Sequence, residues 1–263
     1  MKSAVTISLV PEARGGPFVF WDDLERATHE AIELGFDAIE VFPPSAESIS
    51  DLKTQIRIAA VGTGAGWVKH QLTFTNPDES VRRRAVEFAE GIVDAAGQLG
   101  APAIIGSMQG KWSAEVNREQ AMKYLGDALA HLGGRAQRHG VPLFYEPLNR
   151  YETNLVNTMG QGADFLRPLA TRNIRLLADL FHLGIEEENV PNALRGGTTY
   201  LGHVHLADSN RKPAGNGHTD FTPIAHALRD VDYDGYVSAE CLPYPNSAAA
   251  ARATIDAFNR YFR

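Results

Sequence analysis

The sequence predicts a (β/α)8 TIM barrel that spans residues 1–263 as a single domain. Three observations support this prediction: the chain length, the alternation of strand-like and helix-like segments, and the residues that end several of the strands. A chain of 263 residues is close to the usual size of this fold. Regular alternation favours a parallel sheet with helices outside, and eight units favour closure into a barrel over an open sheet.

Eight segments have the β-branched, apolar character of strands and are bounded by Gly, Pro or Asn. They are predicted at Ala4–Val10, Ala38–Phe42, Arg57–Val61, Ala103–Ser107, Val141–Glu146, Arg175–Asp179, Gly202–Ala207 and Tyr236–Glu240. No linker, low-complexity tract or block of charge divides the chain. All eight strands are therefore expected to belong to one sheet.

Amphipathic helical patterns lie between these strands, with apolar residues at helical spacing. Helices are expected at Asp22–Leu34, Glu79–Leu99, Asn117–His139 and Ser247–Tyr261. Asn117 is suited to cap the N-terminus of its helix, since its side chain can accept a backbone N–H. Gly35, Gly100 and Gly140 each follow a helical pattern and precede a strand, which predicts glycine C-caps.

Composition excludes several classes of function. The net charge of −7 argues against a nucleic-acid partner or an anionic membrane surface, both of which require a basic face. The single cysteine, Cys241, excludes an intramolecular disulfide. No apolar run is long enough to span a bilayer and no secretory signal is recognisable, so we expect a cytoplasmic protein without a membrane partner.

Four side chains close, or nearly close, four consecutive predicted strands: Glu146, Asp179, His205 and Glu240. A barrel brings the C-termini of its strands together around one central pocket. Three carboxylates in a pocket of low dielectric repel one another unless a cation neutralises them. Three oxygen donors and one imidazole suit a divalent ion such as Mn²⁺ or Mg²⁺ better than a metal that favours thiolates.

Three further polar residues lie in the loops after these strands. Glu152 follows Glu146 in its loop, although a capping acid and a surface acid would give the same pattern. His182 comes three residues after Asp179, which favours the pocket over burial in the core. Arg211 begins a glycine-rich loop, where a guanidinium can hold substrate oxygens.

Other candidates have structural interpretations. His203 points the same way as His205 along a strand, and we assign it only a hydrogen bond inside the barrel. Glu40 lies within a strand and is expected to face the barrel interior as a structural acid. The segment Gly62–Trp67 departs by one position from a dinucleotide-binding fingerprint. It predicts a tight loop at the barrel mouth, with Trp67 lining the pocket.

Together these residues resemble the xylose-isomerase-like TIM-barrel superfamily of sugar isomerases and epimerases, and most closely its D-tagatose and D-psicose 3-epimerase group. The matching stretches all lie in the second half of the chain: Glu146–Glu152, Asp179–His182, His203–His205, Ser209–Arg211 with the glycine loop after it, and Ala239–Glu240. One departure is Ala214, where many of these epimerases have proline before the glycine.

The resemblance implies roles for seven residues. The implied metal ligands are Glu146, Asp179, His205 and Glu240. The residues implied to contact the O1 and O2 end of the substrate are Glu152, His182 and Arg211. One divalent metal ion is expected as the cofactor, with Mn²⁺ preferred over Mg²⁺ or Co²⁺.

These expectations combine into a metal-dependent ketose 3-epimerase that works through an enediolate. Glu146 and Glu240 would be the catalytic pair, one removing a proton and the other returning it to the opposite face. Two alternatives share the enediolate and stay open: an aldose–ketose isomerase similar to hydroxypyruvate isomerase, and a dehydratase acting on a keto-sugar or keto-inositol. We expect a small, unphosphorylated ketose or keto acid as substrate, and a homo-oligomer, either a dimer or a tetramer.

Two functions of other classes are less well supported. An endonuclease IV-like repair enzyme shares the fold but needs more ligands, for several zinc ions, and a basic surface. A sugar-binding barrel without catalysis would lack a base or a ligand, whereas all seven positions are filled here.

Overall fold

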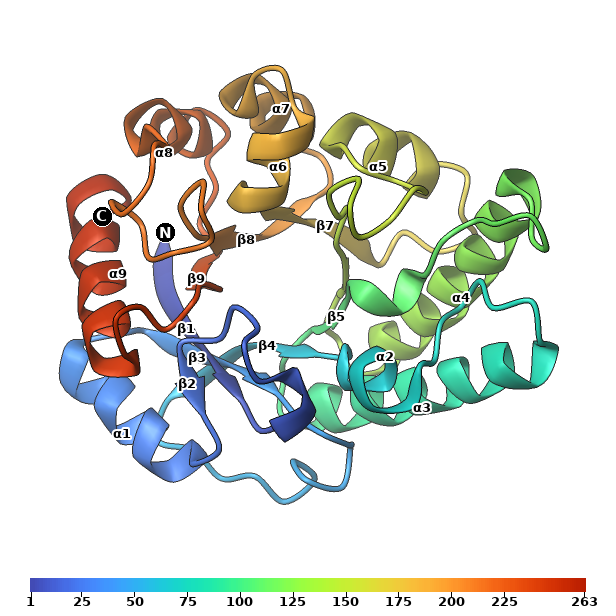
Figure 1. Cartoon of the computed structure of the whole chain (residues 1–263), viewed down its shortest axis with the longest axis horizontal. Helices are drawn as coiled ribbons and strands as arrows, with labels where there is room; N and C mark the ends of the chain where they lie inside the picture. The colour runs from blue at the N-terminus through green and yellow to red at the C-terminus, as the bar shows by residue number, and fades with distance from the viewer.

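Eight parallel strands close into a barrel in the computed structural model, which describes residues 1–263 (Figure 1). In order around the barrel they are β1 (Lys2–Ser8), β3 (Ala38–Phe42), β4 (Arg57–Gly62), β5 (Ala103–Ile105), β6 (Leu143–Tyr145), β7 (Ile174–Asp179), β8 (Leu201–Leu206) and β9 (Tyr236–Ala239). Parallel pairing of β9 with β1, from Lys2↔Tyr236 to Val5↔Ala239, closes the sheet. The predicted TIM-barrel fold is confirmed.

The remaining strand, β2 (Phe20–Trp21), pairs in parallel with the last residues of β1. It follows a loop at the barrel mouth that contains the short 3-10 helix η1 (Pro11–Ala13). Two residues are too few to show a period-2 pattern, so this strand was not expected from the sequence.

Helices form a ring outside the barrel (Figure 1). They are α1 (Leu24–Leu34), α2 (Ala65–His70), α3 (Glu79–Gln98), α4 (Arg118–Arg138), α5 (Met159–Leu166), α6 (Leu180–Glu186), α7 (Val190–Gly196), α8 (Phe221–Asp230) and α9 (Ser247–Tyr261), with a second 3-10 helix, η2 (Ser107–Gln109). All four helices predicted from periodicity are present. None of the helices combines the length and apolar character needed to cross a membrane.

The predicted helix ends are also confirmed. The Asn117 side chain accepts a hydrogen bond of 2.9 Å from the Gln120 N–H and so caps α4. Gly35, Gly100 and Gly140 all have positive φ, at 84°, 69° and 72°, the backbone region that glycine adopts without a steric cost.

Five predicted strands extend too far at their C-terminal ends, and two of them, those predicted to end at Ala207 and Glu240, run one residue beyond the ends of β8 and β9. β1 stops at Ser8 rather than Val10, β5 at Ile105 rather than Ser107, and β6 at Tyr145 rather than Glu146. The chain leaves the sheet at these points to form the loops of the barrel mouth, and apolar character alone does not mark where pairing stops. Glu146 consequently lies just beyond its strand.

Two apolar layers enclose the strands. The main core of 61 buried residues lies between the sheet and the helices. A smaller cluster, made by Ala60, Ile104, Phe144 and Leu177, fills the barrel interior. The Phe144 ring stacks on the His203 ring with 5.2 Å between centroids, so the inner layer supports the polar groups at the barrel mouth.

A cluster of charges joins α3 to α4. Arg135 donates hydrogen bonds of 2.8 Å to Asp94 from Nε and to Glu90 from Nη1. His139 Nε2 lies 3.0 Å from Asp94 Oδ1. The hydrogen bonds from Arg135 lower the pKa of Asp94, although partial burial opposes them.

We expect Arg135→Ala to lower the free energy of unfolding by about 1 kcal/mol and the Tm by about 2–4 °C. Because the pKa of Asp94 is lowered on folding, this stabilisation is present above the unfolded pKa and is lost as pH falls through the folded value. Thermal unfolding at neutral pH and at about pH 3 measures the difference. Arg138→Ala, an exposed arginine on the same helix, is the control. If Arg135→Ala lowered stability equally at both pH values, the stabilisation would not come from the ion pair between Arg135 and Asp94.

Candidate metal centre and active site

The structure brings together the four side chains that were predicted as metal ligands. Glu146 directly follows β6, Asp179 is the last residue of β7, His205 is the penultimate residue of β8, and Glu240 directly follows β9. One ligand atom from each residue can be chosen so that all four lie within 4.8 Å of one another. These strands are neighbours in the barrel, so the four side chains form an arc at its mouth.

His205 Nδ1 lies at the centre of this arc. It is 3.2 Å from Glu240 Oε2, 3.5 Å from Asp179 Oδ2 and 3.6 Å from Glu146 Oε1. Both His205 Nδ1 and Glu146 Oε1 are buried and have no hydrogen-bond partner. Buried polar atoms are rarely left unpaired. An imidazole nitrogen that faces three carboxylates fits a divalent cation held between them.

The charges in the pocket also favour a bound cation. Three carboxylates form the arc, Glu40 adds a fourth behind His205, and the Arg211 guanidinium pairs with two of them, those of Asp179 and Glu240. Burial raises the pKa of Glu146, and the neighbouring Glu240 raises it further. Burial opposes ionisation of Asp179 as well, but Arg211 holds its pKa well below the usual range. The site therefore has an excess of negative charge that a divalent ion would neutralise.

Glu40 has a larger part in the site than the structural role predicted for it. Its carboxylate faces the barrel interior and contacts His203 Nε2 at 2.8 Å through one oxygen and His205 Nε2 at 3.0 Å through the other. With the Nε2 proton of His205 shared with Glu40, the Nδ1 lone pair is directed at the carboxylate arc. A carboxylate behind a histidine ligand fixes its tautomer and raises its basicity. The hydrogen bond predicted for His203 is confirmed.

We expect Glu40→Gln to weaken divalent-metal affinity by about 10- to 100-fold, because the amide no longer fixes the His205 tautomer. Calorimetric titration of the chelator-treated protein with Mn²⁺ measures this. Ser238→Ala is the matched control. Ser238 lies on β9 beside His205 of β8, and its buried hydroxyl has no hydrogen-bond partner. Wild-type affinity in Glu40→Gln would show that His205 is oriented by something else.

Beside the arc, Asn149 joins two residues that were predicted to contact the substrate. Its Nδ2 donates to His182 Nδ1 at 2.7 Å and to Glu152 Oε1 at 3.1 Å. Its Oδ1 accepts the Tyr151 N–H at 3.0 Å, which fixes the amide orientation. A neutral His182 therefore carries its proton on Nε2, the nitrogen that lies 3.8 Å from Glu146 Oε1. Asn149 lies within the Glu146–Glu152 motif, but no pattern in the sequence marked it as buried.

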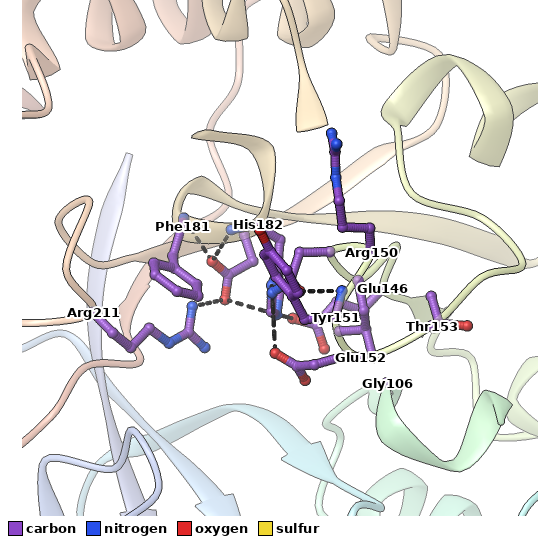
Figure 2. Close-up of polar contacts among 12 residues, drawn as sticks. Gly106, Glu146, Arg150, Tyr151, Glu152, Thr153, Phe181, His182 and Arg211 are labelled. Carbon is purple, nitrogen blue, oxygen red and sulfur yellow. Dashed lines mark hydrogen bonds and ion pairs between the residues drawn. The ribbon is translucent and has the colours of Figure 1, made fainter. Parts of the chain in front are cut away.

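Arg211 lies on the other side of the arc (Figure 2). Its guanidinium donates to both Asp179 and Glu240 and stacks 4.9 Å above the Phe181 ring centroid. Burial alone would lower the pKa of Arg211, but the two carboxylates raise it. The backbone of Arg211 is left-handed, with φ 61°, so the surrounding loop must hold it in place.

Asp208 holds that loop. It is fully buried, and its carboxylate accepts N–H groups from Ser209 at 2.7 Å, Gly215 at 2.8 Å and Thr219 at 3.0 Å. These hydrogen bonds lower its pKa, against the opposing effect of burial. Asp208 was not among the predicted site residues. A strand-end Asp before a loop rich in Gly and Asn is the signal that could have identified it.

The seven predicted site residues line or border one cavity of about 540 Å³. The loop after β1, residues 12–18, covers one side of it, and Trp67 lines it as expected from the sequence. Gly106 sits against the metal-ligand arc, since a Cβ there would lie 2.5 Å from Glu146 Oε2. A side chain at this position would displace the carboxylate.

The fold and this donor set define a (β/α)8 barrel with a candidate metal site at the C-terminal ends of its strands. The chain belongs to the xylose isomerase-like TIM barrel family, whose model matches residues 29–261.

Several known proteins that resemble the chain are epimerases. An L-ribulose 3-epimerase from Mesorhizobium japonicum is 33% identical over 83% of this chain and 75% of its own length. A 3-dehydro-D-guloside 4-epimerase from Escherichia coli is 28% identical over 79% of this chain and 83% of its own length. A crystal structure of D-psicose 3-epimerase with D-tagatose from Clostridium cellulolyticum H10 superposes with a TM-score of 0.81, at 22% identity and with 100% of each chain covered.

Proposed function

We propose that this protein is a divalent-metal-dependent ketose 3-epimerase, an enzyme of the isomerase class. The observation that supports this most directly is the arc of three carboxylates and one imidazole at the barrel mouth. Glu146 and Glu240 stand at its two ends, with the β7 and β8 ligands between them. This placement lets the two glutamates approach a substrate from different sides.

In the proposed reaction, one of these glutamates removes the proton from carbon 3 of the ketose. The other delivers a proton to the opposite face, which inverts the configuration. When bound, the divalent ion supplies Lewis-acid polarisation of the carbonyl next to the reacting carbon. The same two groups serve the reverse reaction with their roles exchanged.

Glu152, His182 and Arg211 are proposed to hold the O1 and O2 end of the substrate. Asn149 orients the first two through the hydrogen bonds described above. Arg211 offers several N–H donors from a position beside Asp179 and Glu240, and Phe181 covers it from behind. Fixing the substrate in this way places the reacting C–H next to a glutamate before the proton is removed.

Arg211→Ala is expected to lower kcat/KM by about 100-fold because the substrate loses its orientation. Affinity for Mn²⁺ should not fall, since removing a cation that contacts Asp179 and Glu240 cannot weaken their attraction for another cation. Steady-state kinetics and metal titration measure the two effects separately. Arg211→Lys keeps the charge but not the planar fork, and it tests the need for several donors. Loss of metal with unaltered kinetics in excess Mn²⁺ would reverse the proposed roles.

The alternatives that remain use the same enediolate. An aldose–ketose isomerase needs a base on one face only, and a dehydratase begins with the same proton removal. The Mn²⁺-loaded protein should be tested against ketoses, aldoses, hydroxypyruvate and keto-inositols, with products followed by NMR. Interconversion of two ketoses that differ at carbon 3 supports the proposal. Aldehyde or dehydrated products, without epimerisation, would assign one of the alternatives.

Mn²⁺ is proposed as the physiological ion because three oxygen donors and one nitrogen suit it. Mg²⁺ and Co²⁺ are the alternative ions for the same site. A homo-oligomer of two or four copies and a cytoplasmic location also remain our predictions. Light scattering after gel filtration determines the number of copies, and cell fractionation determines the location.

A further inference from the structure

A second cavity of about 490 Å³ adjoins the one that contains the metal-ligand arc. The two cavities share four wall residues: Trp67, Ser107, Leu148 and Glu152. Glu152 is thus at the boundary, next to the metal centre on one side and open to the second cavity on the other. Nothing in the proposed epimerisation of a single ketose uses this second space.

The walls of the second cavity combine flat aromatic surfaces with hydrogen-bonding groups. Trp67 and Tyr151 are 40% and 76% exposed, so both aromatic side chains are accessible to a ligand. The remaining wall is largely polar, with Thr73, Asn76 and Lys111 among its residues. Aromatic faces with surrounding donors and acceptors suit a neutral, hydroxyl-rich ring better than an apolar group or a phosphate. A phosphate would also meet the negative charge of Glu152.

Hydrogen bonds join the loops that form the second cavity. Two of its walls are the loops after β5 and β6, which are linked by hydrogen bonds from Trp112 N to Asn154 Oδ1 at 2.9 Å and from Thr153 Oγ1 to the Gly110 carbonyl at 2.8 Å. Lys111 Nζ donates to the Tyr151 carbonyl at 3.2 Å. A cavity whose walls are fixed before binding loses less entropy when it takes up a ligand.

We infer that the substrate carries a second sugar unit, which occupies this cavity while the ketose unit lies at the metal centre. This inference rests on the proposed function, because Glu152 is assigned there to the O1 end of the ketose. The second unit is then attached at O1, the position nearest the boundary between the two cavities. Tyr151 provides a face on which the second ring stacks, and Lys111 provides a donor for its hydroxyls.

The test compares D-fructose with two glucosyl derivatives of it, one linked at O1 and one at O6, using the Mn²⁺-loaded protein. We expect kcat/KM for the O1-linked sugar to exceed that for the O6-linked sugar by at least about tenfold. Tyr151→Ala should remove most of this preference, and Tyr151→Phe should retain it because the flat ring remains. An equal rate for the two linkages, or a preference that Tyr151→Ala leaves unaltered, would overturn the inference.

Saturation-transfer NMR with the O1-linked sugar gives an answer that does not depend on turnover. Protons of both rings should receive saturation from the wild-type protein, and those of the glucosyl ring should lose it in Tyr151→Ala. Saturation of the ketose ring alone would overturn the inference. If none of the three sugars reacts while both rings are saturated, the proposed epimerase function fails and the second sugar site stands.

Discussion

Asp179→Asn and Glu240→Gln should each reduce affinity for Mn²⁺ by more than about 100-fold. Altering a residue that orients a metal ligand costs about 10- to 100-fold in affinity, and loss of the ligand itself should cost more. Epimerase activity at limiting metal should fall in parallel. Asp179 also accepts the backbone N–H groups of Phe181 at 2.8 Å and His182 at 3.2 Å, and an Asn oxygen can accept them as well. The substitution therefore removes the charge and leaves the start of α6 intact.

Metal analysis after gel filtration, followed by calorimetric titration, measures the loss. Asp164→Asn is the matched control, since that carboxylate lies on the surface and pairs only with Arg167. The main core lies outside the barrel, so circular dichroism should show a folded protein for every variant and for the chelator-treated wild type. Wild-type metal content in both Asp179→Asn and Glu240→Gln would exclude them as ligands.

The second large effect concerns the two-base mechanism. Glu146→Gln and Glu240→Gln, each studied at saturating Mn²⁺, should lower the rate of epimerisation by about 10²- to 10⁴-fold, the usual contribution of a general base. Each variant keeps one carboxylate. We therefore expect each to exchange the carbon 3 proton of one epimer with solvent, and the two variants to act on opposite epimers.

Proton exchange in D₂O, followed by NMR for each epimer separately, distinguishes this from simple loss of metal. Glu152→Gln serves as the control, because it alters substrate contact and should slow exchange of both epimers to a similar extent. Exchange of both epimers by both variants would mean that one of the other groups, or water, is the base.

The fold and the metal-ligand arc were predictable from the sequence for the same reason. Parallel strands in a barrel end around one pocket, so the residues that close the strands must converge. The short strand β2 and the short helices carry too few residues for a periodic pattern, and they were not located. Glu40 was recognised as an interior acid, but its contact with His205 joins residues far apart in the sequence and depends on the barrel's closure.

Asn149 and Asp208 were missed for a different reason. Each acts by hydrogen bonds to neighbours within its own loop or the adjacent one. A sequence shows that a loop contains Asn and Asp, but it does not show which of them turns inward. The position of Arg211 between Asp179 and Glu240 likewise depends on the left-handed turn that Asp208 holds in place.

The position of deuterium in the product tests the central claim most directly. The wild-type, Mn²⁺-loaded protein is incubated with a reactive ketose in D₂O, and the product is examined by NMR. A 3-epimerase with two opposed glutamates places solvent deuterium at carbon 3 of a ketose whose configuration there is inverted. Deuterium at carbon 1 of an aldose–ketose pair, or loss of water without a deuterated ketose, would contradict the account.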